Sequence, residues 1–270
     1  MAQKEGGVFR KLFIFLLVVI AIFAPWIAPH DPYAPNYSNL LAGPSWSHWA
    51  GTDEYGRDIL SRLILGARIS LSVGFISIIA GGVIGTILGL ISGYFGGFLD
   101  KLIMRASDIM FAFPDLLLAI AIVAILGPGI ENVVIALSVF SVPSFARLVR
   151  GSALEAKQTE YVEAAQSMGA SSTRIIRKHI FPTSVGGLLV FCSMRMGGAI
   201  LAAATLSFLG LGASPETPDW GAMLSMGRDY LGSAPHIVLY PGLVLFLTVL
   251  AFNLIGDGLR DVFDPKSANE

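Results

Sequence analysis

Long apolar stretches alternate with shorter polar segments along almost the whole chain. Six stretches are long and apolar enough to cross a lipid bilayer as helices, which takes about 20 residues each. They cover Leu12–Ala28, Ser70–Gly93, Ile109–Leu126, Val133–Leu148, Val185–Leu209 and Ile237–Ile255. Because backbone N–H and C=O groups find no water in lipid, each stretch is expected to be helical. The pattern predicts an all-α polytopic membrane protein with six transmembrane helices.

The first stretch has two interpretations. Lys4, Arg10 and Lys11 precede it, as basic residues precede the apolar core of a secretory signal peptide. The run is at the long end for a signal peptide and finishes at Pro25 and Trp26, so an uncleaved first crossing is favoured.

The distribution of Lys and Arg predicts the orientation. With the N-terminus in the cytosol, 13 of the 18 basic residues fall on the inner side and four on the outer side, which follows the positive-inside rule. Both termini are therefore predicted to be cytosolic. The chain divides into a first helix with an outer loop (residues 1–69), a membrane core (70–258) that carries the large inner loop 149–184, and a cytosolic tail (259–270).

Composition supports a membrane protein and excludes several other classes. Apolar residues make up 54% of the chain and charged residues 14%, against about 25% charged in soluble proteins. The formal net charge of −1 gives no basic field for nucleic acid. Cys192 is the only cysteine, and His30, His48, His179 and His236 are scattered along the sequence. We therefore expect no disulfide framework, no metal site and no cofactor.

The inner loop reads as two short helices outside the membrane. Thr159 is placed to cap the first, and Gly169 is placed to end it in a left-handed conformation. Ser171 or Ser172 is placed to start the second, which is expected to stop before Pro182.

One face of the first loop helix suggests contact with another molecule. Val162, Ala165 and Gln166 share a face at helical spacing, and Ala164 beside Ala165 keeps the helix thin. Such a helix suits a groove on a partner protein. An amphipathic connector resting on lipid headgroups fits the spacing equally well.

Four blocks of residues stand out along the chain. One is Glu163-Ala164-Ala165, followed by Gly169 and Pro182. The other blocks are Gly51-Thr52-Asp53 with Gly56-Arg57-Asp58, Leu206-Ser207-Phe208-Leu209-Gly210 with Trp220, and Phe252-Asn253-Leu254 with Gly256-Asp257-Gly258. Together they resemble the permease subunits of ABC importers, in the branch that handles dipeptides, oligopeptides and nickel, and the first block resembles the EAA loop of these permeases. The resemblance spans about residues 10 to 265, in matching order and spacing.

The resemblance implies the fold of a type I ABC importer permease in the cytoplasmic membrane. It implies a subunit that translocates di- or oligopeptides, a nickel chelate or a similar small solute. Glu163, Ala164, Ala165, Gly169 and Pro182 would form the coupling loop that docks on the ATPase. The implied partners are a second permease, two ATPase subunits and an extracytoplasmic binding protein.

The chain itself shows no signature of an enzyme. It contains no G-x-x-x-x-G-K-[ST] sequence to cradle ATP phosphates, so ATP hydrolysis is expected on a separate subunit. The alternatives are a transporter driven by an ion gradient, or a channel or scaffold. An ion-driven transporter needs paired titratable residues along its path, and the crossings offer almost none besides Arg195 and Asp115.

Two patterns within the crossings point to packing or transport. Gly81, Gly85, Gly89 and Gly93 share one helical face and predict a packing seam, either internal or toward a second permease. Arg195 lies near mid-membrane, where a charge costs about 2.5–3.5 kcal/mol on insertion scales. An internal ion pair with Asp115 is the favoured interpretation, and a cationic patch on the translocation path is the alternative.

Charged residues also gather in the outer loop. Asp53, Arg57, Asp58 and Arg62 suggest a short surface helix with an Asp58–Arg62 pair at i,i+4, exposed to solvent. A docking contact with the binding protein is the alternative. Trp220, in the later outer loop, is expected at the membrane interface.

Overall fold

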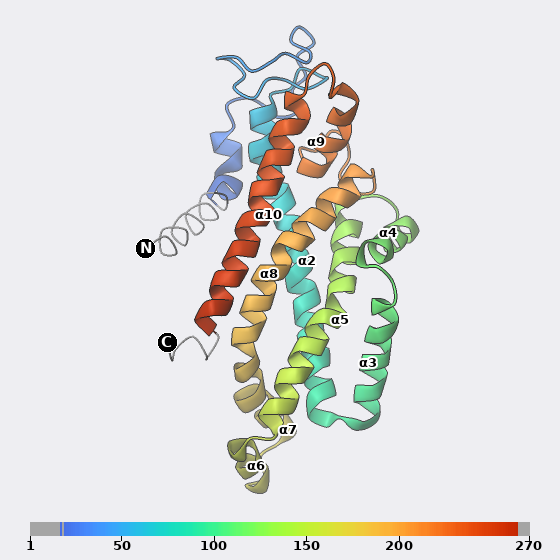
Figure 1. Ribbon diagram of the computed structural model, residues 1–270, viewed down its shortest axis with the longest axis vertical. Helices are drawn as coiled ribbons and strands as arrows, with labels where there is room; N and C mark the ends of the chain where they lie inside the picture. Colours follow the sequence, from blue (N-terminus) through green and yellow to red (C-terminus); the bar gives the residue numbers. More distant parts are fainter. Residues whose placement is uncertain (1–16, 18, 264–270) are drawn as a thin grey trace.

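The computed structural model describes residue 17 and residues 19–263, and long helices standing side by side dominate it (Figure 1). Residues 19–27 are helical. The following elements are α2 (Ile59–Phe95), α3 (Gly97–Phe111), α4 (Asp115–Leu126), α5 (Ile130–Lys157), α6 (Glu160–Ser167), α7 (Ser172–Ile175), the π-helical turn η1 (Ile176–Ile180), α8 (Phe181–Phe208), α9 (Trp220–Gly227), the 3₁₀ turn η2 (Arg228–Tyr230) and α10 (His236–Phe263). The described residues form no strand, in agreement with the all-α expectation.

Four helical segments of the described chain are long and apolar enough to cross a membrane. They are Ile59–Phe95, Ile130–Lys157, Ser172–Phe208 and His236–Arg260, and α3 with α4 would make a fifth if the pair is one broken span. The first expected crossing, Leu12–Ala28, falls largely outside the described residues. Six crossings with both termini in the cytosol therefore remain a prediction.

The third expected crossing, Ile109–Leu126, is not a continuous helix. Its first residues belong to the end of α3 and its last to α4, and the two helices meet at 93°. Pro114 lies at the break, where it lacks an N–H and disfavours a helical conformation of Phe113. At about 1.5 Å per residue, the 12 residues of α4 extend about 18 Å, which is too short to cross alone.

Helix α2 begins well before the expected Ser70. Asp58 caps it, because a carboxylate oxygen accepts from the backbone N–H of Ser61 at 2.8 Å. With 37 residues, α2 is about 55 Å long and extends beyond a hydrocarbon core of about 30 Å. Helix α2 is therefore longer than one crossing requires.

The four seam glycines of α2 lie against α5. A Cβ added at Gly81 would stand 2.6 Å from the carbonyl oxygen of Ser138, and one at Gly89 would stand 2.5 Å from that of Ala146. The α2–α5 contact is the most extensive between any two helices of the described chain. The glycine face of α2 therefore packs against α5 of the same chain.

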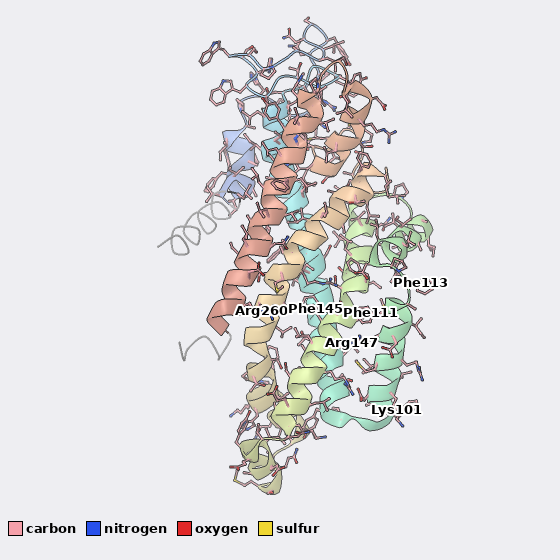
Figure 2. All side chains as sticks on the ribbon, viewed as in Figure 1. Lys101, Phe111, Phe113, Phe145, Arg147 and Arg260 are labelled. Atoms are coloured by element: carbon pink, nitrogen blue, oxygen red, sulfur yellow. The ribbon has the colours of Figure 1, made fainter. Side chains whose placement is uncertain are left out.

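Helix α3 runs back along α5 after a sharp turn. The guanidinium of Arg147 on α5 donates to Asp108 at 2.8 Å and lies 4.4 Å from the centre of the Phe111 ring (Figure 2). Nearer the turn, Arg150 donates to both carboxylate oxygens of Asp100, at 2.5 and 2.7 Å. These bonds attach α3 to α5 along its length.

The connecting segments gather at opposite ends of the bundle. Residues 28–58 and 209–235, here called the outer cap, lie at one end, and α6 with α7 lies at the other (Figure 1). This matches the expected grouping of the outer loops apart from the inner loop 149–184.

Candidate functional site

Helix α6 contains the Glu163-Ala164-Ala165 sequence and ends as its residues indicate. Gly169 follows with φ of +79°, a left-handed conformation that glycine adopts without strain. Its N–H donates to the carbonyl of Gln166 at 2.9 Å, and the N–H of Ala170 donates to that of Ala165 at 3.0 Å. This pair of bonds is the Schellman motif, which satisfies the last carbonyls of the helix.

The start of α6 differs from the expected side-chain cap. Thr159 occupies the N-cap position, but its hydroxyl donates to the carbonyl of Ala156 at 2.6 Å. Its backbone carbonyl accepts from Val162 and Glu163 at 3.0 and 3.1 Å. Thr159 therefore joins α6 to the end of α5 instead of capping through its side chain.

The face of α6 that carries Val162 and Ala165 packs inside this chain. Val162 is fully buried and Ala165 nearly so. They belong to an apolar cluster contributed by α2, α5, α7 and η1: Leu90, Tyr94, Val149, Ala153, Ala156, Val162, Ala165, Ile175 and Ile180. Gln166, which shares the expected face, remains exposed.

The opposite face of α6 is open at the end of the bundle. Glu163, Ala164 and Gly169 are exposed, and Met168 has 82% of its surface accessible. A large exposed methionine beside an alanine gives this surface both an adaptable apolar side chain and a shallow profile.

The second loop helix does not stop before Pro182. Helix α7, the π-turn η1 and α8 form one continuous helical segment, Ser172–Phe208. Pro182 enters at the first turn of α8, directly after the wider π-helical turn Ile176–Ile180. A π-turn changes the hydrogen-bonding step, so the missing N–H and the ring of proline are accommodated without a break. The inner loop is therefore joined to α8 by uninterrupted helix.

Arg195 and Asp115 line the same cavity of about 180 Å³ but do not form the expected ion pair. The guanidinium of Arg195 donates to the hydroxyl of Ser144 at 2.9 Å. It also lies 5.8 and 5.7 Å from the ring centres of Phe140 and Phe191. A hydroxyl acceptor and two aromatic faces thus stabilise the charge.

The charged residues expected on a solvated surface helix are buried instead: Asp53, Arg57, Asp58 and Arg62. Arg57 donates to Asp53 at 2.7 Å, and Arg62, only 1% exposed, lies 3.6 Å from the same carboxylate. The i,i+4 pair that forms is Asp53–Arg57, because Asp58 is used in capping α2.

Arg62 joins the two segments of the outer cap. Its guanidinium donates to the carbonyl of Pro32 at 3.1 Å and to those of Glu216 and Pro215 at 3.3 and 3.4 Å. Trp220 is also buried and donates through its indole N–H to the carbonyl of Leu63 at 3.1 Å. Trp220 is therefore a core residue of the cap and does not lie at the membrane interface.

Glu54 is incompletely hydrogen-bonded in this cap. One carboxylate oxygen is buried without a hydrogen-bond partner, and Arg57 is 3.8 Å from the other. Burial raises the pKa of the Glu54 carboxyl above its ordinary value of 4.5.

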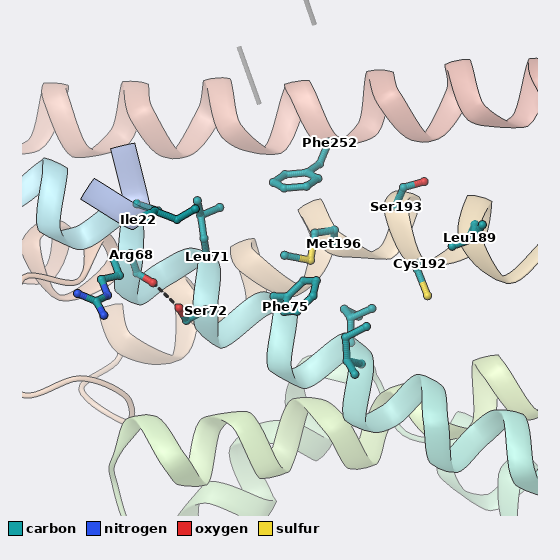
Figure 3. A pocket seen from close by; sticks show the side chains of 13 residues that line it. Ile22, Arg68, Leu71, Ser72, Phe75, Leu189, Cys192, Ser193, Met196 and Phe252 are labelled. Atoms are coloured by element: carbon teal, nitrogen blue, oxygen red, sulfur yellow. Dashed lines mark hydrogen bonds between the residues drawn. The ribbon is translucent and has the colours of Figure 1, made fainter. Parts of the chain in front are cut away.

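A cavity of about 750 Å³ opens between the first helix, α2, α8 and α10. In Figure 3, Phe252 of α10 and Phe75 of α2 face it from opposite sides, and Arg68 lies at one end. Arg68 is the only charged residue in the lining, is exposed and has no side-chain partner among the described residues. Sequence reasoning missed Arg68 because only the fold places it in an apolar cavity.

Comparisons with known proteins all match membrane components of transport systems. The family model described as "Binding-protein-dependent transport system inner membrane component" matches residues 85–269. A second model, "N-terminal TM domain of oligopeptide transport permease C", matches residues 12–44. The glutathione transport system permease proteins GsiD of Escherichia coli O157:H7 and Shigella boydii serotype 4 are each 56% identical over 267 residues, covering 98% of this chain and 88% of theirs.

Solved structures share the fold. The methionine ABC transporter MetNI in an inward-facing conformation superposes with a TM-score of 0.62 at 23% identity, covering 76% of this chain and 98% of that chain. An amino acid ABC transporter with histidines superposes with a TM-score of 0.56 at 16% identity, covering 73% and 92%.

Proposed function

Because the chain belongs to the family of binding-protein-dependent transport system inner membrane components, we propose that it translocates a short peptide of the glutathione type across the cytoplasmic membrane. Membership makes it a non-catalytic permease subunit of an ABC importer, working with ATPase subunits and a binding protein. The observation that supports the peptide substrate is 56% identity to glutathione permeases over 98% of the chain. The ion-driven transporter and the unpowered channel are thereby removed as alternatives.

The complete complex pairs this chain with a second permease, two ATPase subunits and one extracytoplasmic binding protein. In this arrangement α6 docks on an ATPase through its exposed face, which carries Glu163, Ala164 and Met168. Its buried face rests on α2, α5 and η1, so movement of the ATPase reaches three elements at once.

The continuous helix Ser172–Phe208 supports a lever-like coupling. Because no helix break separates α7 from α8, a displacement of α7 is transmitted directly to the membrane part of α8. Pro182 lies within this lever, and Gly169 holds the turn between α6 and α7. ATP-driven closure would push α6 and tilt α8 between inward-open and outward-open states.

The coupling proposal is tested with two variants, one that reverses an exposed charge on α6 and one that disrupts the turn after it. Glu163→Lys and Gly169→Pro should lower both the co-purification of ATPase subunits and the ATPase stimulation by loaded binding protein, while membrane insertion is retained. Proline cannot adopt the φ of +79° at position 169 and would lose the N–H that closes the motif. Glu155→Lys, an equal charge change at an exposed position of α5, is the matched control. Wild-type recovery and stimulation in both test variants would refute the coupling role.

We assign the translocation path to the cavity that contains Arg68. A lone arginine in a cavity that Ser72 and Ser193 also line suits the carboxylates of a short peptide, whereas apolar lipid gives it no partner. Arg195, already bonded to Ser144 and flanked by two phenylalanine rings, acts in helix packing instead. The open side of the cavity would then face the second permease.

A further inference from the structure

Three potential metal ligands meet in the outer cap although they are far apart in the sequence. His30, His48 and Asp58 each offer one ligand atom, and these atoms all lie within 4.8 Å of one another. His30 follows the first helix, His48 lies in the long outer segment, and Asp58 caps α2. Their separation in sequence explains why the histidines look unrelated there.

The carboxylate is already held in position. One oxygen of Asp58 accepts from both the backbone N–H and the hydroxyl of Ser61, at 2.8 and 2.7 Å. The other oxygen faces Nδ1 of His48 at 2.9 Å. Asp58 is 3% exposed, so one oxygen is oriented by the protein and the other is directed at an imidazole. Such outer contacts are what orient metal-binding carboxylates.

The ring of His30 is held with a free nitrogen lone pair. Its Nε2 lies 2.8 Å from the carbonyl oxygen of Ser47 and must donate, because a carbonyl oxygen can only accept. In the neutral ring, Nδ1 is then unprotonated and able to bind a metal. A backbone carbonyl on the second ring nitrogen is the usual way in which a ligating histidine is fixed. The rings of His30 and His48 have their centres 4.8 Å apart.

We propose that His30, His48 and Asp58 bind a divalent transition-metal ion of the Zn²⁺ type. Two imidazole nitrogens and one carboxylate oxygen form a ligand set that suits Zn²⁺ and its neighbours. The ion takes the place of the proton on Nδ1 of His48, and the metal-bound ring is a neutral imidazole protonated at Nε2. From the neutral ring the proton therefore moves through water to Nε2, and from the doubly protonated ring one proton is released to water.

The movement required is small. Ligands bound at 2.0–2.2 Å in tetrahedral geometry are about 3.3–3.6 Å apart, so the 2.9 Å gap between His48 and Asp58 opens by about 0.4–0.7 Å. The His30 ligand atom already lies within 4.8 Å of the other two, and its exposed ring has room to close the remaining distance. Water occupies the fourth position.

A metal here would join three stretches of the chain: the one after the first helix, the one around His48 and the start of α2. The backbone N–H of His30 already donates to the hydroxyl of Ser61 at 3.0 Å, so the end of the first helix touches the start of α2 at the same point. The ion would add a bond between this contact and the segment around His48. The inference concerns the cap and does not depend on the identity of the transported solute.

The test uses the full chain in lipid nanodiscs, purified through a tag without histidine. Zn²⁺ is titrated by calorimetry, and Co²⁺ is followed by its visible absorption and displaced with Zn²⁺. The wild type should bind one ion per chain, and His30→Gln and His48→Gln should each bind at least tenfold more weakly. His179→Gln, at the opposite end of the bundle, is the matched control and should bind as the wild type does.

The unfolding temperature without metal is measured for every variant, so that loss of binding is separated from loss of fold. Zn²⁺ should raise it in the wild type and in His179→Gln, and not in the two cap variants. Equal Zn²⁺ affinity in the wild type and in the His30→Gln/His48→Gln double variant would overturn the proposal. The three residues would then be a hydrogen-bonded cluster only.

Discussion

Gly85, at the contact between α2 and α5, offers a sharp test of the packing seam. A Cβ added there would stand 2.5 Å from the Cβ of Phe145 and 2.6 Å from the carbonyl oxygen of Val142. Ordinary contacts begin at about 3.4 Å, so Gly85→Ala lacks about 0.9 Å of space. Neither neighbour can rotate away, because the Val142 oxygen is part of the backbone and the Phe145 Cβ is attached directly to the backbone.

Gly82, one turn away on the same helix, provides the matched comparison. A Cβ at Gly82 would meet the ring of Phe145 at 3.5 Å, an ordinary contact. Both substitutions gain the same helix propensity, about 1 kcal/mol. Only Gly85→Ala adds the cost of overpacking, about 1–3 kcal/mol. The two alanine variants should therefore differ in free energy of unfolding by about 1–3 kcal/mol, with Gly85→Ala the less stable.

The assay is thermal unfolding of each variant in the same lipid nanodiscs, followed by tryptophan fluorescence. At about 2–4 °C per kcal/mol, the two midpoints should be several degrees apart. Yield and peptide uptake report whether the looser seam also impairs transport. Equal midpoints for Gly85→Ala and Gly82→Ala would show that α2 and α5 do not approach as closely as described, and the seam argument would fail.

Three further outcomes are expected. Glu54→Gln should raise the unfolding temperature near neutral pH. The pKa of Glu54 is raised in the folded protein, so its contribution to stability is present below pH 4.5 and is lost as pH rises through the folded pKa. The gain from the substitution should therefore disappear when both proteins are melted at pH 4.5 or below. Arg68→Gln should reduce uptake of a dianionic peptide several-fold while Arg68→Lys retains most of it; ATPase co-purification, measured in parallel, should not change, and equal uptake by both variants would contradict the path assignment. Trp220→Phe should lower the free energy of unfolding by about 1 kcal/mol for the lost bond to Leu63, with more for the space left by the smaller ring; an unchanged melt would argue against a buried indole.

Features with a local cause could be anticipated from the residues alone. Gly169 ends α6 where expected, because only the left-handed conformation closes that turn and glycine adopts it freely. The register of Gly81, Gly85, Gly89 and Gly93 indicated a close approach, since every fourth position lies on one face. The resemblance of Glu163-Ala164-Ala165 and its flanking residues to a permease loop agreed with the family match.

Local rules about proline gave mixed results. Pro114 coincides with the 93° bend between α3 and α4. Pro182 was expected to end a helix, yet the helix continues through it after a π-turn. Proline removes the same N–H in both places, but the surrounding contacts decide whether the chain bends or changes its hydrogen-bonding step.

The sequence by itself determined which segments avoid water, which positions suit a helix end, and which helix face is thin enough for close packing. These properties depend on residue type and spacing over a few turns. Only the tertiary structure decided how the polar groups are paired: Arg62 with the carbonyls of two distant loops, Arg195 with Ser144 in place of Asp115, and His48 with Asp58 beside His30. A buried charge must find a partner, but its partner is whichever group the packing of remote helices brings within about 3 Å, and no local pattern contains that distance.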